Sequence, residues 1–411
     1  MHVPPFSLSQ QITDLGTDLE QAVLGVLQSG QYIGGPQVST FEQSFADNVG
    51  TRHAIGCNSG TDALILALRA IGIGPGDEVI TCAFSFFATA EAISAVGATP
   101  VFVDVDPETF LIDLNQIEVA ITGSTRALMP VHLFGRPVDM TRLMDIASRH
   151  DLRVIEDCAQ ATGATWQDQA VGSFGDVGCF SFFPTKNLGA AGDGGVATTS
   201  DAGLAQTMRE LAVHGMPERY LHTHLGYNSR LDAIQAAVLN VKLPKLETWI
   251  SRRAAIAARY QDALTDLSGL SLPTAEEGHS WNQFVVRIGS CPSGQPLCKA
   301  TCTPSSTSAR HGIPESCCRD WLKQTLQERG VSTIIYYPIP IHRQPAYAHL
   351  GLEQGSLPVT EQLCSQVLSL PIFPELTEEQ QQVVIDTLRQ LLQMAPPTRL
   401  PRRDDQQPMA A

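Results

Sequence analysis

Short apolar runs alternate with amphipathic segments between about residue 50 and residue 200. Apolar runs bounded by turn residues predict strands, and apolar residues at helical spacing predict helices. The predicted strands are 78–84, 99–106, 126–135, 153–157 and 179–183, and the predicted helices are 61–70, 88–96 and 138–150, the first capped by Thr61. Strands separated by helices are typical of a mostly parallel sheet with helices on both faces, so the pattern predicts an α/β fold.

The pattern changes in the second half of the chain. Two long helices are predicted at 231–243 and 249–267, followed by a strand at 282–289 and a helix-plus-strand unit over 320–337. These elements predict a smaller α/β domain, and the Pro-rich, polar end of the chain predicts disorder. The predicted organisation is a large domain (1–245), a small C-terminal domain (246–394) and a disordered tail (395–411).

One segment of the predicted small domain has no hydrophobic period. Residues 290–318 are rich in Pro, Ser, Thr and Cys, which favours an inserted, exposed loop. The cysteine spacing lacks two CxxC pairs, so a mobile loop explains the segment better than a zinc site does. Four other cysteines lie in apolar or motif-rich segments and are expected to be small buried residues of a reduced protein: Cys57, Cys82, Cys158 and Cys179.

Composition excludes several classes of protein. Apolar residues make up 43% of the 411-residue chain and charged residues 17%, which is typical of a globular protein. The net charge of −15 argues against a nucleic-acid surface. No unbroken apolar stretch is long enough to cross a membrane, and the first residues lack the pattern of a secretory signal. We therefore expect a cytoplasmic protein that binds neither nucleic acid nor a membrane.

A single lysine lies between an aromatic run and a glycine run in CFSFFPTKNLGAAGDGG (179–195). The aromatic run predicts a buried strand, and the glycines allow a tight turn and a close approach of the backbone to a ligand. Because lysine is rarely buried without a partner, Lys186 is expected to project from the end of a core strand into a pocket. Considered alone, the segment is equally consistent with a surface lysine in a glycine loop.

An acidic residue ends another predicted strand, in VIEDCAQATGA (154–164). In parallel sheets ligands lie outside the carboxyl ends of the strands, where both Asp157 and Lys186 are expected. A carboxylate behind an apolar run needs a cation, and a protonated pyridinium nitrogen would be one. A carboxylate that caps a loop or a helix is the alternative interpretation.

Two further segments place polar residues before a predicted helix. In NSGTDALILAL (58–68) the exposed N–H groups, the helix dipole and the Thr61 hydroxyl suit a phosphate. The other segment, GYNSRLDAIQAAVL (226–239), has a polar turn ahead of its helix. Considered alone, the first is more often an ordinary capped helix and the second an ordinary helix start.

Together these segments resemble fold type I enzymes that use pyridoxal 5'-phosphate (PLP), and within them the DegT/DnrJ/StrS-type sugar-nucleotide aminotransferases. The resemblance extends over about residues 5–393, apart from 290–318, and rests on eight motifs in the order of the family. The motifs are SGQYIGGPQVSTFE (29–42), SGTDAL (59–64), GIGPGDEVI (72–80), GATPVFVDVD (97–106), VIEDCAQATGA (154–164), FSFFPTKNLGAAGDGG (180–195), GYNSRLDAIQAAVL (226–239) and YYPIPIHRQPAY (336–347).

The resemblance implies roles for the matching residues. It makes Lys186 the lysine that forms the Schiff base with PLP, Asp157 the partner of the pyridine nitrogen and Gln160 the contact to the phenolic oxygen. Asn228 matches a residue that reaches the phosphate of the neighbouring subunit's cofactor, which implies a homodimer with shared active sites. The remaining cofactor residues that it implies would hold the phosphate (Gly60, Thr61 and Ser181) or stack on the ring (Phe86).

The implied reaction converts a nucleotide-linked keto sugar to an amino sugar, with glutamate as the expected donor and glutamine as the alternative. The lysine, once released from the cofactor, can move a proton between the substrate carbon and the cofactor. A non-catalytic regulator or sensor of the same fold is the rival interpretation. The set of Lys186, Asp157 and Gln160 argues against it, and Lys186 also argues against relatives that carry histidine there and dehydrate sugars.

Substrate identity depends on weaker signals. Phe183 and Tyr336 stand where many relatives carry Tyr and His, near the expected sugar pocket. Tyr336, Tyr337 and His342 are candidate sugar contacts, with core packing as the alternative for the tyrosines. The loop NLGAAGDGG (187–195) resembles that of relatives that aminate a 3-keto sugar, whereas relatives that act at C4 more often show Glu-Gly-Gly. We therefore expect a 3-keto substrate, with a 4-keto substrate as the alternative.

Overall fold

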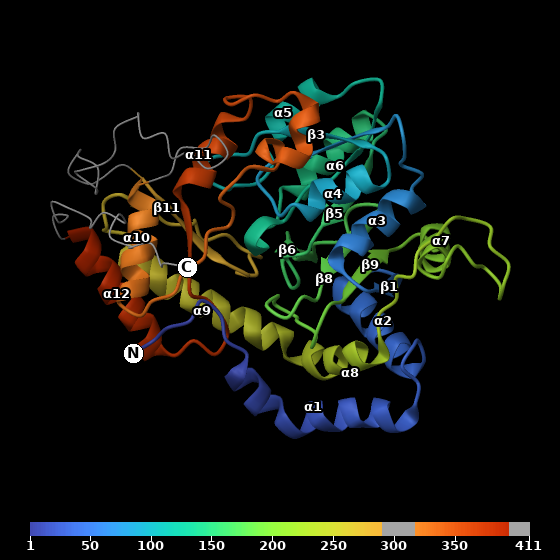
Figure 1. The fold of residues 1–411 in the computed structure, drawn as a ribbon, viewed down its shortest axis with the longest axis horizontal. Helices are drawn as coiled ribbons and strands as arrows, with labels where there is room; N and C mark the ends of the chain where they lie inside the picture. Colours follow the sequence, from blue (N-terminus) through green and yellow to red (C-terminus); the bar gives the residue numbers. More distant parts are fainter. Residues whose placement is uncertain (290–316, 394–411) are drawn as a thin grey trace, which may run out of the picture.

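The computed structural model describes residues 1–289 and 317–393 (Figure 1). Its centre is a seven-stranded sheet in which β9 is antiparallel to both of its neighbours and the successive pairs from β8 to β3 are parallel. The strands, in spatial order, are β1 (His53–Cys57), β9 (Gly195–Thr199), β8 (Val177–Ser181), β5 (Arg153–Asp157), β4 (Thr125–Leu128), β2 (Glu78–Cys82) and β3 (Thr99–Val103). The predicted α/β fold with a mostly parallel sheet is confirmed.

Helices cover both faces of this sheet, and strand β8 shows why. Val177 and Cys179 pack in one apolar cluster with residues of α3 (Gly60–Ala70) and α7 (Ala202–Ala212). The Phe180 side chain points to the opposite face and packs in a different cluster with residues of two other helices. These are α2 (Pro36–Val49) and α8 (Ala233–Lys242). The alternation follows from the period of two along a strand, and it buries β8 on both sides.

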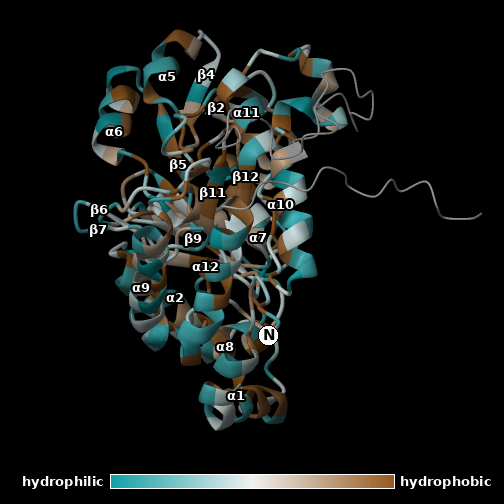
Figure 2. Cartoon of the chain, turned by 90° about the vertical axis from the view of Figure 1, so that its left-hand side faces the viewer, coloured by the Kyte–Doolittle hydropathy of each residue, from teal (hydrophilic) through white to brown (hydrophobic). Residues whose placement is uncertain are grey.

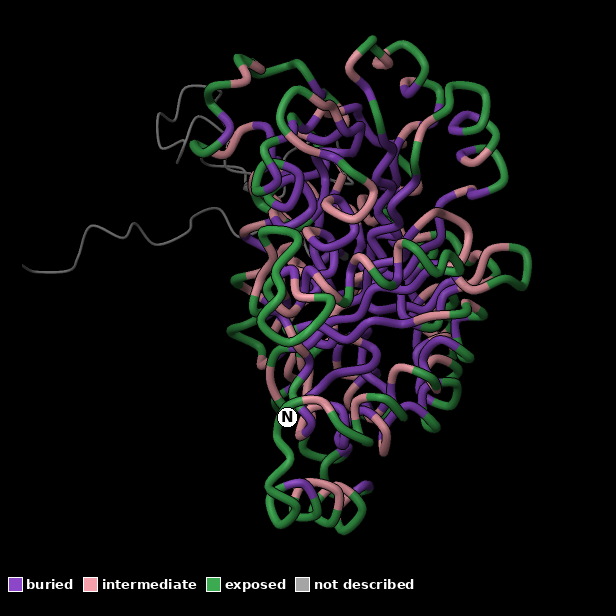
Figure 3. The backbone as a smooth tube through the Cα atoms, turned by 90° about the vertical axis from the view of Figure 1, so that its right-hand side faces the viewer, coloured by how far each residue is buried: buried purple, intermediate pink, exposed green. Residues whose placement is uncertain are grey.

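Further helices complete the large unit. Three of them connect or follow the parallel strands: α4 (Ala88–Ala95), α5 (Leu114–Ala120) and α6 (Met140–Arg149). The first helix, α1 (Ser9–Ser29), packs on α8 and is largely exposed at one end of the molecule, whereas the strands are almost entirely buried (Figure 3).

A second unit is built around a three-stranded antiparallel sheet. Its strands are β10 (Leu270–Ser271), β11 (Phe284–Ile288) and β12 (Val367–Leu370), and its helices are α9 (Leu246–Leu264), α10 (Cys317–Glu328), α11 (Pro358–Gln366) and α12 (Glu378–Gln393). Figure 2 shows hydrophilic residues over the outer surface of α9.

Val3 belongs to the core of this unit and donates its N–H to the Gly330 carbonyl over 2.8 Å. The N-terminal residues therefore pack with the second unit, and the domain boundary at residue 245 stays a prediction.

The structure corrects several predicted element boundaries. The strand expected over 126–135 ends at Leu128, and the chain passes Pro130, which has no N–H to donate, into a short 3₁₀ helix at Leu133–Gly135. Ser59, rather than Thr61, caps α3, because its hydroxyl oxygen accepts the Asp62 N–H over 3.1 Å. The strand expected near residue 337 is reduced to isolated bridges at Val331 and Ile334.

The expected insert and tail fall mostly outside the described residues. The structure does not describe residues 290–316 and 394–411. Residues 317–318, which were expected in the loop, begin α10. The four cysteines of the large unit are buried free thiols, as predicted: Cys57, Cys82, Cys158 and Cys179. In the two described ranges, no helix is both long enough and apolar enough to span a bilayer.

Candidate active site

The ends of several strands bring the predicted site residues to one edge of the large sheet. Gly195, the first residue of β9, pairs with Cys57 at the end of β1 and with Ser181 at the end of β8. Asp157, the last residue of β5, pairs with Cys179 of β8. The segments that follow β1, β5 and β8 therefore leave the sheet side by side, as expected at the carboxyl edge of a parallel sheet.

The first turn of α3 lies directly against this edge. A Cβ on Gly60 would lie 2.7 Å from the Ser181 Cβ, and a Cβ on Gly195 would overlap the Ser59 carbonyl. Glycine is thus required at both positions by close packing. The N–H groups of Gly60 and Thr61 precede the first intrahelical hydrogen bonds, so this cradle of N–H and hydroxyl groups suits a phosphate.

Asp157 is buried, with 4% of its surface exposed, and its carboxylate has two hydrogen-bond donors. The Thr89 hydroxyl donates to Oδ2 over 2.8 Å and the Ala159 N–H donates to Oδ1 over 3.1 Å. Burial raises the pKa of Asp157, while these two donors and the charge of Lys186 oppose the rise. Each oxygen keeps a lone pair, so the carboxylate can accept a further hydrogen bond from a cation.

Lys186 lies five residues beyond the end of β8 and is half-buried. Desolvation lowers the pKa of its amine to about 8, although the negative charge of Asp157 acts in the opposite direction. Within residues 1–289 and 317–393, no group forms a hydrogen bond or ion pair with Lys186 Nζ. The amine is therefore available for reaction, and a lowered pKa increases the unprotonated, nucleophilic fraction at neutral pH.

Gln160, Tyr337 and Phe86 form one side of the site. Gln160 Nε2 donates to the Tyr337 hydroxyl over 2.7 Å, and its Oε1 accepts the Phe134 N–H over 2.8 Å, which fixes the amide orientation. The ring centroids of Tyr337 and Phe86 are 6.1 Å apart. Phe86 is 58% exposed, so one of the largest apolar side chains near this edge remains open to a flat ligand.

Three of the predicted residues make none of the contacts described above for Gln160, Asp157 and the first turn of α3, apart from the Tyr336 ring beside Tyr337. Tyr336 is half-buried, with its ring centroid 5.6 Å from that of Tyr337. His342 is only 2% exposed, and its Nε2 lies 3.2 Å from a carboxylate oxygen of Glu361. Asn228 is exposed, and its side chain has no hydrogen-bond partner in the described part of the chain. Their roles as sugar or cofactor contacts stay predictions.

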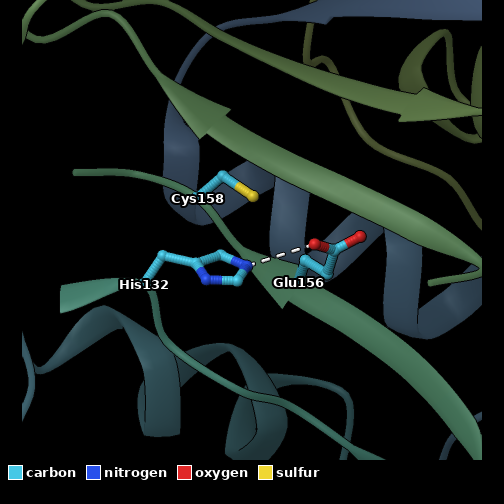
Figure 4. Close-up of side chains that lie close together, drawn as sticks. All are labelled: His132, Glu156 and Cys158. Atoms are coloured by element: carbon cyan, nitrogen blue, oxygen red, sulfur yellow. Dashed lines mark hydrogen bonds and ion pairs between the residues drawn. The ribbon is translucent and has the colours of Figure 1, made fainter. Parts of the chain in front are cut away.

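A buried network beneath the site was not identified from the sequence. The Glu156 carboxylate accepts N–H groups of Gly172, Phe174 and Gly175, each over 2.8 Å, and lies 3.1 Å from His132 Nε2 (Figure 4). The other ring nitrogen accepts the Val138 N–H over 3.0 Å. Cys158 completes a set of three potential metal ligands. Because the imidazole and the carboxylate already have partners, we interpret the set as a hydrogen-bond network that supports the end of β5.

Two buried side chains that the sequence did not single out hold the loop after Lys186. Lys242, on α8, donates its Nζ hydrogen to the Gly189 carbonyl over 2.8 Å. Asn187 donates from Nδ2 to the carbonyls of Thr162 and Ser280, over 3.2 and 3.0 Å. Neither residue carries a sequence signal of this role, because their partners are backbone carbonyls from distant segments.

Residues 13–293 and 299–389 match the model of the DegT/DnrJ/EryC1/StrS aminotransferase family. The chain belongs to this family. The family resemblance noted in the sequence is thus confirmed, and the inserted loop expected over 290–318 stays a prediction. DegT/DnrJ/EryC1/StrS aminotransferases depend on PLP, and the glycine cradle, the available amine and the buried carboxylate described above fit that cofactor.

The relatives of this DegT-family chain include enzymes and a protein named as a regulator. It is 44% identical over 392 residues to a UDP-N-acetyl-3-dehydro-alpha-D-glucosamine 3-aminotransferase of Acidithiobacillus ferrooxidans, which covers 95% of this chain and 98% of that protein. It is also 44% identical over 392 residues to a pleiotropic regulatory protein of Geobacillus stearothermophilus, covering 94% and 98%. The crystal structure of Streptomyces venezuelae DesV with a ketimine intermediate superposes with a TM-score of 0.87 at 42% identity, covering 96% and 99%.

Proposed function

We propose that this PLP-dependent aminotransferase converts a 3-keto sugar nucleotide to the 3-amino sugar nucleotide with glutamate as amino donor. The observation that carries the proposal is the pairing, at one sheet edge, of an available amine of lowered pKa with a buried carboxylate. The choice of C3 is supported by the loop after Lys186 and by the similarity to the Acidithiobacillus ferrooxidans 3-aminotransferase.

In this proposal Lys186 attaches the cofactor and acts as the acid–base group. When bound, PLP withdraws electrons from the substrate carbon and carries the amino group between the two half-reactions. Lys186 Nζ would take a proton from the α-carbon of glutamate in the first half-reaction and would deliver a proton to C3 of the sugar in the second, for which an amine pKa of about 8 is suitable. Asp157 holds a proton on the ring nitrogen by accepting its hydrogen bond.

The other residues orient the cofactor. Gly60, Thr61 and Ser181 would hold the phosphate in the cradle described above. Gln160, whose amide is fixed by the Phe134 N–H, would donate to the phenolic oxygen, and the exposed ring of Phe86 would pack on the cofactor ring. Of the three candidate sugar contacts, Tyr337 is hydrogen-bonded to Gln160.

We also propose a homodimer whose subunits share their sites. The segment 29–36 exposes Tyr32 and Ile33, and the segment before Asn228 exposes Tyr220 and Leu225. Exposed apolar groups of this kind are typical of interaction surfaces. Asn228 is exposed beside them, so it is available to a site on a second subunit. Mixing inactive Lys186→Ala with inactive Asn228→Ala chains should restore part of the activity, whereas mixed dimers without recovery would contradict sharing.

Two consecutive measurements test the reaction. Borohydride reduction of the purified protein should fix the cofactor to Lys186, identified by peptide mass spectrometry. Added glutamate should convert the bound cofactor to its pyridoxamine form, which 3-keto sugar nucleotides should convert back. Recovery only with 4-keto sugars would overturn the C3 assignment. No response to glutamate would favour a regulatory role, which the name of the Geobacillus stearothermophilus relative makes the second candidate.

A further inference from the structure

Two hydroxyl groups form a chain that ends on the Asp157 carboxylate. The Thr89 hydroxyl donates to Asp157 Oδ2 over 2.8 Å, and Thr89 Oγ1 lies 2.8 Å from Ser85 Oγ. Both hydroxyl residues are buried. Water therefore cannot readily replace either partner, and loss of one would leave a buried polar group unsatisfied.

The ionisation of Asp157 determines the direction of this chain. An ionised carboxylate can only accept, so the single hydroxyl proton of Thr89 is directed to Asp157. Thr89 Oγ1 is then the acceptor, and Ser85 is the donor, in the second hydrogen bond. Hydrogen bonds linked in this way polarise one another, so the Ser85 hydroxyl strengthens the bond that Thr89 makes to the carboxylate.

The same two residues also hold the segment that carries Phe86. Ser85 and Phe86 precede α4, and Thr89 lies in its first turn. The Thr89 N–H donates to the Phe86 carbonyl over 3.2 Å, while its hydroxyl binds β5 through Asp157. The relay therefore joins two walls of the site that come from different strands.

We propose that Ser85 and Thr89 are positioning residues that keep Asp157 ionised and directed at the ring nitrogen of PLP, and that fix Phe86 relative to it. The inference rests on the proposed role of Asp157. Neither residue contacts the cofactor in this account, so they act only through Asp157 and the backbone of Phe86. Among residues 1–289 and 317–393, the other titratable groups that interact electrostatically with the Asp157 carboxylate are Lys186, His132, Tyr337, Cys82, Cys158 and Cys179.

The test measures PLP affinity against pH in apo-protein by titration of cofactor absorbance. Thr89→Val keeps the side-chain shape but removes the donor, and we expect PLP binding to weaken by about 10- to 100-fold. Because binding needs an ionised Asp157 and the lost donor favours its protonated form, the decline of affinity at acid pH should begin at a higher pH. Ser85→Ala should show the same changes to a smaller extent, and Thr89→Ser should restore wild-type behaviour.

A matched control separates positioning from general loss of packing. Thr387 on α12 is also buried and donates its hydroxyl only to the Val383 carbonyl, so Thr387→Val should leave both affinity and the acid limb unchanged. Wild-type affinity in Thr89→Val, or weaker binding without movement of the acid limb, would overturn the relay. Should Thr89→Val not fold, an unmoved acid limb in Ser85→Ala would overturn it.

Asp157→Ala in the same assay separates this inference from the proposed function. Weaker PLP binding in Asp157→Ala together with wild-type behaviour in Thr89→Val would refute the relay alone. Unchanged binding in Asp157→Ala would refute the assigned role of the carboxylate itself.

Discussion

Lys186 lies in the loop between β8 and β9, and Lys242 on α8 binds the same loop; both lysines are desolvated, and their surroundings differ. Burial lowers the pKa of both amines to about 8. Lys242 is 4% exposed and donates to the Gly189 carbonyl, so its hydrogen-bonding role is structural. Lys186 Nζ has no such partner among the described residues, and it interacts electrostatically with the carboxylate of Asp157. A lowered pKa thus indicates desolvation, and only the available amine beside a carboxylate indicates a reactive site.

The largest difference between the two lysines should appear on their removal. Lys186→Ala should lose covalent cofactor attachment and reduce turnover by about 10²- to 10⁴-fold, as expected when an acid–base group is deleted. Lys242→Met should retain attachment at Lys186. Rates of the glutamate half-reaction, with mass spectrometry of the borohydride-reduced protein, measure both effects. Turnover near the wild-type value in Lys186→Ala would contradict the assignment of Lys186 as the acid–base group.

Gly189 links the two lysines, so a change there should affect both regions. A Cβ on Gly189 would overlap the Pro184 carbonyl. We expect Gly189→Ala to lower the free energy of unfolding by about 1–3 kcal/mol through overpacking and to slow PLP attachment. Gly25→Ala in α1, where a Cβ meets no atom within 4 Å, is the control and should be neutral or slightly stabilising. Urea unfolding of the apo-protein gives the stabilities, and equal values for both variants would contradict the close packing.

Lys242→Met should act on stability alone. It leaves the buried Gly189 carbonyl without its donor, which we expect to cost about 1–3 kcal/mol of unfolding free energy. The exposed Lys245 makes no side-chain hydrogen bond in the described residues, so Lys245→Met serves as the matched control. Urea unfolding of the three apo-proteins measures the difference, and a Lys242→Met protein as stable as Lys245→Met would show that the hydrogen bond contributes nothing net.

The smallest effects concern pH. Since the unprotonated amine is the nucleophile, the rate of PLP attachment to apo-protein should rise with pH through a midpoint at about 8, the pKa of Lys186, and level at higher pH. The charge of Asp157 raises that pKa, so Asp157→Asn should move the midpoint to a lower pH. Lys242→Met should leave the midpoint unmoved. Stopped-flow absorbance over a pH series measures it, and a midpoint near that of an exposed lysine would contradict the desolvation of Lys186.

The local pattern of apolar residues is sufficient to predict most strands of the large unit but not the residues at which its elements begin and end. Apolar runs placed β2, β3, β5 and β8, because a buried parallel strand needs continuous apolar residues whatever its neighbours are. The predicted strand at 126–135 failed where Pro130 and the contacts of the following turn decide the path. The sequence predicts Thr61 as the cap of α3, whereas Ser59 caps it, because either hydroxyl satisfies the local rule.

The candidate site divides in the same way. Lys186 and Asp157 could be selected because each has a chemical character at odds with its apolar neighbours in the chain. The sequence also indicates His342 as a sugar contact; the fold buries it beside Glu361, and that role stays a prediction. Thr89 had no distinguishing signal, since its hydroxyl has meaning only next to a carboxylate 68 residues away in the chain.

The α/β class, the order of the motifs and the residues that carry reactive groups follow from the amino-acid sequence alone, because these depend on periodicity and side-chain chemistry within short segments. Which of the two similarly desolvated lysines is available can be seen only in the folded chain, since availability depends on whether a distant carbonyl, such as that of Gly189, accepts a hydrogen bond from the amine. The same holds for the ionisation of Asp157. Its pKa follows from burial and from donors on other elements, which the folded chain alone brings within hydrogen-bonding distance.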